Sequence, residues 1–360
     1  MTTDLLEIPV ASTGPPPGSL TGALCTGVTE LAVVSVDWFS CTWPIPDGEA
    51  VDWHVENLLL QLAYLIDDQE PLDYGKFGYS RIIRLNGSAL LMFNPERSDM
   101  GVHLEIPASG FRSFLGPEDT VESLIDLLVN QLGGRPTRID VAYDDYAGLL
   151  DIEAIDEYFA RGAFVCRWRT GRREYEFRCS DQEPRGRIVR LGKRQSEAYG
   201  RIYDKRLEQV AKGKTVEHEY WHRVEIEFKG AKAPAVAQLV LREDAPEQLR
   251  GLLYGYLDFK EVDAEDSNKR RWPTSSWWLT FLDNVGKVHL CLPKPSESVE
   301  KTGEWLEAQI APSIALMAVA MGAGDVAAGM AYIRELVDDG IARFRKRHER
   351  MLLEYRRQHG

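Results

Sequence analysis

Polar and apolar residues alternate in three segments whose composition otherwise favours β-strands. Successive side chains of a strand point to opposite faces, so each segment would present one apolar face and one polar face. The segments are RIDVAYDD (138–145), GRIYDK (200–205) and HRVEIEFK (222–229), with polar positions at Arg138, Asp140, Asp144, Arg201, Tyr203, Lys205, Arg223, Glu225 and Glu227. If the three strands are neighbours in one sheet, these side chains share a single polar site.

The order of the predicted elements occurs twice along the chain. The first series is a strand at 31–44, a helix at 51–65, strands at 79–84, 89–94 and 101–110, and a helix at 121–132. The second is a strand at 138–145, a helix at 151–162, and strands near 164–169, 174–179, 187–191, 199–205 and 220–229. We therefore predict an α+β fold in which two related half-domains share a curved, largely antiparallel sheet flanked by helices.

Composition along the chain predicts three regions. Residues 1–27 are rich in Pro, Gly, Ser and Thr, which is typical of a flexible tail. Residues 28–295 form the main domain, with half-domains at about 31–132 and 135–260, and residues 296–360 form a helical region with a basic end.

The N-terminal sequence and the cysteines predict the compartment. MTTDLLEIPV lacks the basic and apolar segments of a signal peptide. The five cysteines are scattered, with no Cys-x-x-Cys pair, which fits a reducing compartment. We expect a cytoplasmic protein that does not associate with membranes.

Charge is unevenly distributed along the chain, whose net charge is −13. Residues 161–215 contain sixteen Lys or Arg and seven Asp or Glu, and residues 343–357 contain seven and two. An isolated charge run is ordinarily a solvated face, but a basic stripe on an acidic body is typical of phosphate-backbone contacts. This separation of basic segments from an acidic remainder favours nucleic acid as the partner.

The residue types on the polar faces suit one reaction. Carboxylates are preferred ligands of Mg²⁺ and Mn²⁺, a bound cation polarises a phosphodiester, and a tyrosine is able to attack it covalently. The alternative is structural, because a strand tyrosine is more often a packing residue. In that case Asp140 and Glu225 simply pair with arginines. His218 and His222 lack a third partner for a metal site and are predicted to be surface or substrate-contact residues.

The order of three motifs is similar to that of a known family. RIDVAYDD, GKRQSEAYGRIYDKRLEQ and WHRVEIEFKG resemble segments of the Rep_trans group, the rolling-circle replication initiators of certain plasmids and filamentous phages. MGVHLEIPASGFRSF upstream, and LDFKE, RRWPTSSWW and EKTGEWLEAQIAPSIA downstream, extend the resemblance over residues 31–315. The resemblance implies an HUH-like nicking fold, although we find no His-apolar-His pair.

The resemblance also implies a role for each motif residue. Tyr203 is the nucleophile, Asp140 and Glu225 hold Mg²⁺ or Mn²⁺, and Arg201 and Lys205 contact the phosphate or the transition state. The open alternatives are Tyr199 as nucleophile and Asp144, Asp145 or Glu227 as ligands. The predicted DNA-binding residues are Arg172, Arg173, Arg187, Arg190, Lys193, Arg194, Ser196 and Arg206.

The implied function is that of a rolling-circle replication initiator. Such an enzyme nicks one strand of an origin by metal-dependent tyrosine transesterification, keeps a 5′-phosphotyrosine link, and rejoins the strand. The alternative is a non-catalytic DNA-binding regulator or recruiter related to these initiators. The expected partner is DNA, as an origin hairpin that is single-stranded at the nick. For the basic C-terminal helix, DNA binding, recruitment of a host helicase and pairing with a second copy stay open.

Overall fold

The computed structural model describes residues 32–115, 119–182, 184–290, 299, 302–303, 306–344 and 346–359. The predicted tail at 1–27 and the predicted boundary between 295 and 296 lie outside these residues. The chain forms two compact units, Met1–Leu292 and Pro293–Gly360. Each unit is described by itself.

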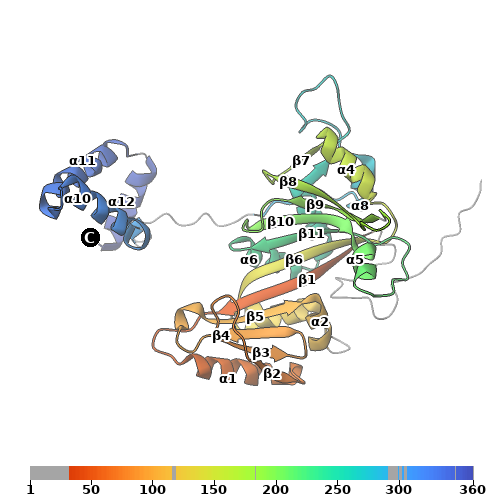
Figure 1. The fold of residues 1–360 in the computed structure, drawn as a ribbon, viewed down its shortest axis with the longest axis horizontal. Coiled ribbons are helices and arrows are strands. Elements are labelled where there is room, and N and C mark those ends of the chain that lie inside the picture. The colour runs from red at the N-terminus through yellow and green to blue at the C-terminus, as the bar shows by residue number, and fades with distance from the viewer. Residues whose placement is uncertain are drawn as a thin grey trace, which may run out of the picture. The chain divides into compact units, whose positions relative to one another are not determined.

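A ten-stranded sheet forms the frame of the first unit (Figure 1). The strand order is β2-β3-β4-β5-β1-β6-β11-β10-β9-β8, and neighbouring strands are antiparallel. The strands are β1 (Ala32–Trp43), β2 (Gln69–Leu72), β3 (Arg81–Leu85), β4 (Ala89–Phe93), β5 (Val102–Pro107), β6 (Arg135–Asp145), β8 (Gly171–Phe177), β9 (Pro184–Leu191), β10 (Ala198–Asp204) and β11 (His222–Lys229). The predicted α+β class with a largely antiparallel sheet is confirmed.

The two halves of the sheet repeat one order of elements. In the first half, β1 is followed by the helix α1 (Val51–Gln61) and by β2 to β5, and β5 pairs with β1. In the second half, β6 is followed by α4 (Ile152–Arg161) and by β8 to β11, and β11 pairs with β6. The halves meet where β1 pairs with β6. A separate two-stranded sheet joins β7 (Phe164–Cys166) to β12 (Leu257–Phe259).

Apolar side chains cover one face of the central strands, as the alternation predicts. Ile139, Val141, Ile226 and Phe228 are fully buried on this face. Tyr143 joins them, and its hydroxyl donates a hydrogen bond of 2.7 Å to the carbonyl of Leu249. The helices that follow β11 are α6 (Lys232–Val240), α7 (Ala245–Tyr256) and α8 (Ser276–Phe281). Because side chains alternate along a strand, the opposite face of the same strands carries the polar residues.

Helical structure begins at two places where strand or turn was expected. Lys205, predicted to continue a strand, is the first residue of the helix α5 (Lys205–Ala211). The Asp204 side chain caps this helix by accepting a hydrogen bond of 2.8 Å from the Leu207 amide. The predicted strand at 101–110 ends earlier, because α2 (Ala108–Phe114) follows β5 directly.

The remaining short elements of the first unit complete the chain path. The helix predicted at 121–132 is α3 (Val121–Asp126) continued by the π-helical turn η3 (Leu127–Gln131). Two short 3₁₀ helices are η1 (Ala63–Leu65) and η2 (Ser98–Met100).

The second unit is helical over its described residues. It contains the π-helical turn η4 (Leu306–Ile310) and the helices α10 (Ala311–Met321), α11 (Val326–Ala342) and α12 (Lys346–His359). Within the described part of the chain, no individual helix has the length and apolar character of a membrane span. The bent pair α10 and α11 passes that test only when its two helices are taken together.

Candidate functional site

Tyr203 lies near the end of β10 and faces the polar side of the sheet. Its hydroxyl donates a hydrogen bond of 2.9 Å to Oε2 of Glu225 on β11. Arg201 donates to the other carboxylate oxygen of Glu225. Lys205 donates a longer bond of 3.4 Å to the Tyr203 hydroxyl, although it belongs to α5 rather than to a strand. The structure thus brings together four of the residues that the sequence singles out.

The four side chains line a cavity of about 690 Å³. Its other walls come from the start of α2, from α5, and from the connection between α5 and β11. The connection contributes Lys212, Lys214 and His218, and α2 contributes Arg112. Tyr203 is 8% exposed, so most of its side chain is enclosed, and it is one of the residues that line this cavity.

Asp37 is a cavity residue that the sequence analysis missed. The register between β1 and β6 shifts between Val36 and Trp38, which marks a β-bulge. Val36 and Phe39 are both fully buried, so Asp37 and Trp38 share the polar side and line the cavity. The sequence VVSVDWF does contain a signal for this bulge. The apolar positions Val34 and Val36 are two residues apart, whereas Val36 and Phe39 are three residues apart, so the alternation is interrupted.

Arg223 holds two carboxylates beside Tyr203. It is 1% exposed, and it donates to both oxygens of Asp144 at 2.7 and 2.8 Å and to Asp37 at 2.6 Å. Trp221 donates a further hydrogen bond of 2.6 Å to Asp144. Both oxygens of Asp144 are therefore occupied by protein donors.

Asp145, a further alternative ligand, lies on the other face of β6. Its carboxylate accepts hydrogen bonds from the amides of Ala147 and Leu150 at 3.0 and 2.7 Å. This carboxylate fixes the turn after β6 and does not face Tyr203.

Two more carboxylates, those of Asp140 and Glu227, lie on the same face of the sheet, and Glu227 is two residues beyond Glu225 on β11. Asp140 and Glu227 are directly opposite in the β6–β11 register. Arg138 bonds both oxygens of Asp140 at 2.8 and 2.6 Å and lies 2.8 Å from Glu227. Burial raises the pKa of Asp140 to about 7, and the charges of Glu225 and Glu227 add to this although Arg138 opposes it. Asp140 is thus a buried acid that gives up its proton less readily than an exposed aspartic acid.

The surroundings shift the pKa values of Tyr203 and of Lys205. Burial raises the pKa of Tyr203 well above its usual value, and the charge of Glu225 raises it further. Burial lowers the pKa of Lys205, and the neighbouring Arg223 lowers it further. The free protein therefore holds a neutral phenol beside an ammonium group that releases its proton more readily than usual.

The donor chemistry of the acidic face fits a hard divalent cation. Asp140, Glu225 and Glu227 occupy neighbouring positions on two paired strands, and carboxylates are the preferred ligands of Mg²⁺ and Mn²⁺. Within the described residues, no three acidic, His or Cys side chains are gathered as a ready ligand set. Arg138, Arg201 and Lys229 are paired with these carboxylates instead. A cation would therefore have to displace part of this pairing.

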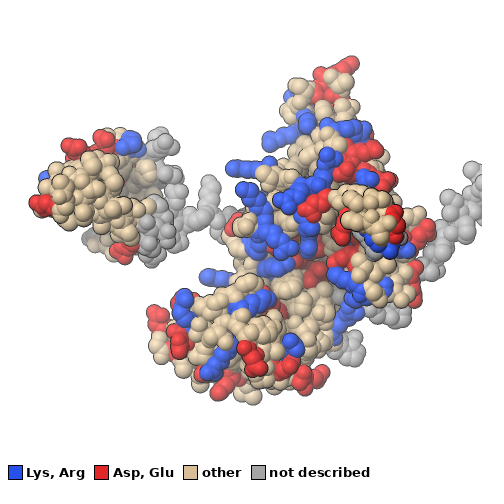
Figure 2. All heavy atoms as spheres, viewed as in Figure 1, with Lys and Arg blue, Asp and Glu red and all other residues tan. Residues whose placement is uncertain are grey.

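Basic residues continue the polar face beyond the tyrosine. Arg190 on β9 is opposite Arg201 on β10 and opposite Arg172 on β8. Arg172 and Arg190, with Lys193 and Arg194, line an open groove of about 700 Å³, whereas Arg201 lines the Tyr203 cavity. Figure 2 shows Lys and Arg side chains gathered over the region of β8 to β11. The structure thus assembles part of the predicted DNA-binding set into one groove.

Tyr199, the alternative nucleophile, belongs to this groove rather than to the cavity. Its hydroxyl accepts a hydrogen bond of 3.4 Å from Arg190, and the Arg194 guanidinium lies 5.6 Å from its ring centroid. Tyr199 is opposite Glu227 in the strand register, whereas Tyr203 hydrogen-bonds Glu225.

Other predicted DNA-binding residues do not line the groove. Arg173 and Arg187 lie on the opposite face and pair with Asp156 of α4. Arg187 also pairs with Glu153. Ser196 lies in the turn before β10, and Arg206 in the first turn of α5. Strand periodicity separates Arg172 from Arg173, but the sequence alone does not say which of them faces the site.

Comparisons with known proteins show which family the chain belongs to. Residues 134–337 match the model of the replication initiation factor family. The chain is 26% identical over 294 residues to the candidate DNA relaxase NicK of Bacillus subtilis (strain 168), which covers 79% of this chain and 80% of NicK. It is also similar to the structure of a rolling circle replication initiator protein from Geobacillus stearothermophilus. That match has a TM-score of 0.61 and 26% identity, and it covers 73% of this chain and 100% of the other. This chain belongs to the replication initiation factor family.

Proposed function

We propose that this protein is a rolling-circle replication initiator that cuts one strand of its origin DNA and later rejoins it. One observation carries the proposal. In a chain of the replication initiation factor family, the Tyr203 hydroxyl is held by Glu225 and Lys205 at the wall of a cavity. A basic groove on the same sheet face continues from that cavity.

The proposed cleavage is a transesterification at one phosphodiester. The Tyr203 oxygen attacks phosphorus, and the phenolic proton leaves along the hydrogen bond to Glu225. The bond between phosphorus and the 3′ oxygen breaks, Lys205 donates a proton to that oxygen, and the 5′ phosphate remains on the tyrosine. The lowered pKa of Lys205 suits such a donor. Rejoining is the same step in reverse.

Arg201 and the acidic face complete the proposed site. Arg201 fixes Glu225 and is placed to neutralise charge on the phosphate. Asp140 and Glu225 are the proposed metal ligands, with Glu227, Asp144 and the cavity residue Asp37 as alternatives. A divalent cation held there would neutralise charge on the scissile phosphate and at Glu225.

The DNA strand is proposed to lie along the groove formed by Arg172, Arg190, Lys193 and Arg194, single-stranded near Tyr203. Phosphate contacts of this kind give affinity without sequence preference. A host helicase and a second copy of the chain remain predicted partners of the C-terminal helices.

A covalent-adduct experiment tests the proposal. The protein is incubated with Mn²⁺ and single-stranded oligonucleotides that tile its replicon, denatured, and examined for linked DNA. We expect an adduct with one oligonucleotide, mapped by peptide mass spectrometry to Tyr203. An adduct on Tyr199 would reassign the nucleophile. DNA binding with no adduct on any oligonucleotide would favour the non-catalytic regulator.

A further inference from the structure

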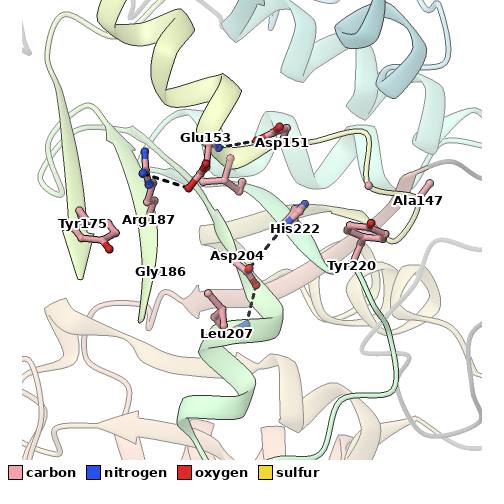
Figure 3. A pocket seen from close by; sticks show the side chains of 12 residues that line it. Ala147, Asp151, Glu153, Tyr175, Gly186, Arg187, Asp204, Leu207, Tyr220 and His222 are labelled. Atoms are coloured by element: carbon pink, nitrogen blue, oxygen red, sulfur yellow. Dashed lines mark hydrogen bonds and ion pairs between the residues drawn. The ribbon is translucent and has the colours of Figure 1, made fainter. Parts of the chain in front are cut away.

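A second cavity, of about 530 Å³, lies on the other face of the sheet beside the start of α4 (Figure 3). Tyr203 and Asp204 are consecutive in β10, so their side chains point to opposite faces. Tyr203 lines the cavity described above, whereas Asp204 lines this second one. We call it the α4 pocket, defined by Asp151, Glu153, Tyr175, Asp204, Tyr220 and His222.

Two exposed tyrosines stand at opposite ends of the α4 pocket (Figure 3). Tyr175 is 51% exposed and Tyr220 is 44% exposed. The Tyr220 ring packs on the turn at Gly148, where a Cβ atom would meet ring atoms at 3.2 to 3.3 Å. Gly148 has a φ of +76°, so the turn needs glycine both for its backbone and for this contact. Tyr220 is thus a supported ring that keeps exposed surface, which is what base stacking requires.

Carboxylates that accept hydrogen bonds line the walls between the tyrosines. Oδ1 of Asp204 caps α5, while its Oδ2 lies 3.8 Å from Nε2 of His222, beyond hydrogen-bond distance. Nδ1 of His222 is buried 3.9 Å from Oδ2 of Asp145, which is not a pocket residue, so only the Nε2 side of the ring is near Asp204. On the α4 side, Glu153 pairs with Arg187 at 3.3 Å, and Oδ1 of Asp151 caps α4, so the carboxylates of the pocket still outnumber its one arginine.

The exposed tyrosine rings and the carboxylates of the pocket together indicate which class of ligand it binds. Acidic walls repel a phosphate, so the part of a DNA strand that fits here is a base rather than its backbone. Carboxylates accept hydrogen bonds from exocyclic amines, as with cytosine N4, whereas thymine offers an acceptor at the same position. The volume lies within the range of ligand pockets.

We propose that the α4 pocket takes one unpaired base of the DNA strand held at Tyr203, with a preference for bases that carry an exocyclic amine. This inference rests on the proposed function, because that function brings single-stranded DNA to the end of β10. Asp204 then serves as the acceptor for the amine, and Tyr220 as the stacking surface.

A binding experiment with two homopolymers tests the base preference. The probes are fluorescent oligo(dC) and oligo(dT) of about twelve nucleotides, measured by anisotropy at one fixed salt concentration. The protein carries Tyr203→Phe and the buffer contains EDTA, so no cleavage occurs. Cytosine and thymine are both pyrimidines and differ at position 4, which isolates the amine. We expect oligo(dC) to bind about fivefold more tightly, or better.

Variants separate the pocket from other DNA contacts. Asp204→Asn keeps a side chain able to cap α5 and should abolish the preference for oligo(dC). Tyr220→Ala should weaken the binding of both probes by about fivefold or more. The matched control is Tyr64→Ala, which removes an exposed tyrosine of the first half and should change neither affinity.

The outcomes distinguish this inference from the proposed function. Equal affinity for the two probes, a preference that survives Asp204→Asn, or unchanged binding by Tyr220→Ala would each overturn the base pocket. None of these measurements requires nicking. A failure to form the tyrosine adduct would therefore overturn the catalytic proposal while leaving a measured base preference intact.

Discussion

The Tyr203 hydroxyl and the Glu225 carboxylate lie 2.9 Å apart on two paired strands. Glu225 is 1% exposed, and its second oxygen is held by Arg201. The carboxylate therefore cannot turn away from the phenol without breaking a buried ion pair. We therefore expect Glu225 to have two roles, because it positions the proposed nucleophile and also stabilises the sheet. Activity and stability measurements test the two roles separately.

Replacing Tyr203 by Phe should abolish the covalent adduct. Only one hydroxyl is removed, so affinity for single-stranded DNA should change by less than about twofold. Denaturing gels measure the adduct, and anisotropy measures binding. Tyr199→Phe is the matched control, because it removes a hydroxyl from the neighbouring groove and should leave the adduct unchanged. A Tyr203→Phe protein that still forms the adduct would end the assignment.

Two substitutions of Glu225 should separate activity from stability. Glu225→Ala leaves Arg201 without its carboxylate partner and should lower the free energy of unfolding by about 3 kcal/mol. Glu225→Gln keeps the shape and a hydrogen-bond acceptor and should cost much less. Both variants should lose adduct formation. Urea denaturation followed by circular dichroism gives the stabilities. A Glu225→Ala variant as stable as the unsubstituted protein would show that the pair with Arg201 contributes little.

The nicking rate should fall at alkaline pH as Lys205 loses its proton. The pKa of Lys205 is lowered from 10.5 by burial and by Arg223, so this loss occurs below pH 10.5. The protonated form is the one required, and activity is therefore present below this pKa and lost above it. Single-turnover nicking rates across this range measure the effect. Lys205→Arg should move the alkaline fall to higher pH because arginine stays charged. An unmoved profile would mean that another group donates the proton.

Arg172 and Arg173 should differ in their effect on salt dependence. Arg172 faces the groove on the side of Tyr203, whereas Arg173 pairs with Asp156 on the other face. Arg172→Ala should reduce the slope of log affinity against log salt by about 0.7 for single-stranded DNA. Arg173→Ala is the matched control and should leave the slope unchanged. The reverse result would place the DNA on the α4 side of the sheet.

Glu208 should stabilise the fold in a pH-dependent way. Burial acts to raise its pKa, but hydrogen bonds from Lys205 and Lys212 outweigh burial and lower the pKa to about 2 from 4.5. A depressed acid pKa gives stability that is present above pH 4.5 and lost as the pH falls towards 2. Its side chain is 34% exposed, so Glu208→Gln should cost only about 1 kcal/mol at pH 7. Thermal unfolding at a series of pH values should show this difference shrinking below pH 4.5. A difference independent of pH would assign the effect to packing.

Strand periodicity predicted correctly which side chains share a face where the alternation is regular. On β11, Val224, Ile226 and Phe228 are buried in the core, which leaves Arg223, Glu225 and Glu227 on the polar face. The face on which each of these side chains lies follows from the alternation of side chains along a strand. The resemblance of the motifs, and not periodicity, indicated which reaction they serve.

Two other features depend on long-range contacts, and the sequence did not predict them: the presence of Asp37 at the cavity and the position of Lys205 in a helix. Asp37 reaches the cavity through a bulge whose position is defined by the pairing of β1 with β6. Lys205 reaches Tyr203 from a helix because the amides of Lys205 and Arg206 bond the carbonyl of Trp221 at 2.8 and 3.0 Å. Neither the strand order nor this contact is encoded in a short window of sequence.

The seam between the halves limits how the chain can be shortened. The family match starts at residue 134, immediately before β6, yet β6 is paired with β1 along its length. A fragment that begins there would leave one edge of β6 bare, which invites aggregation. It would also lack Asp37 and Trp38 and so one wall of the cavity that Tyr203 lines. The N-terminal half, although the family match begins after it, therefore supplies part of the wall around Tyr203.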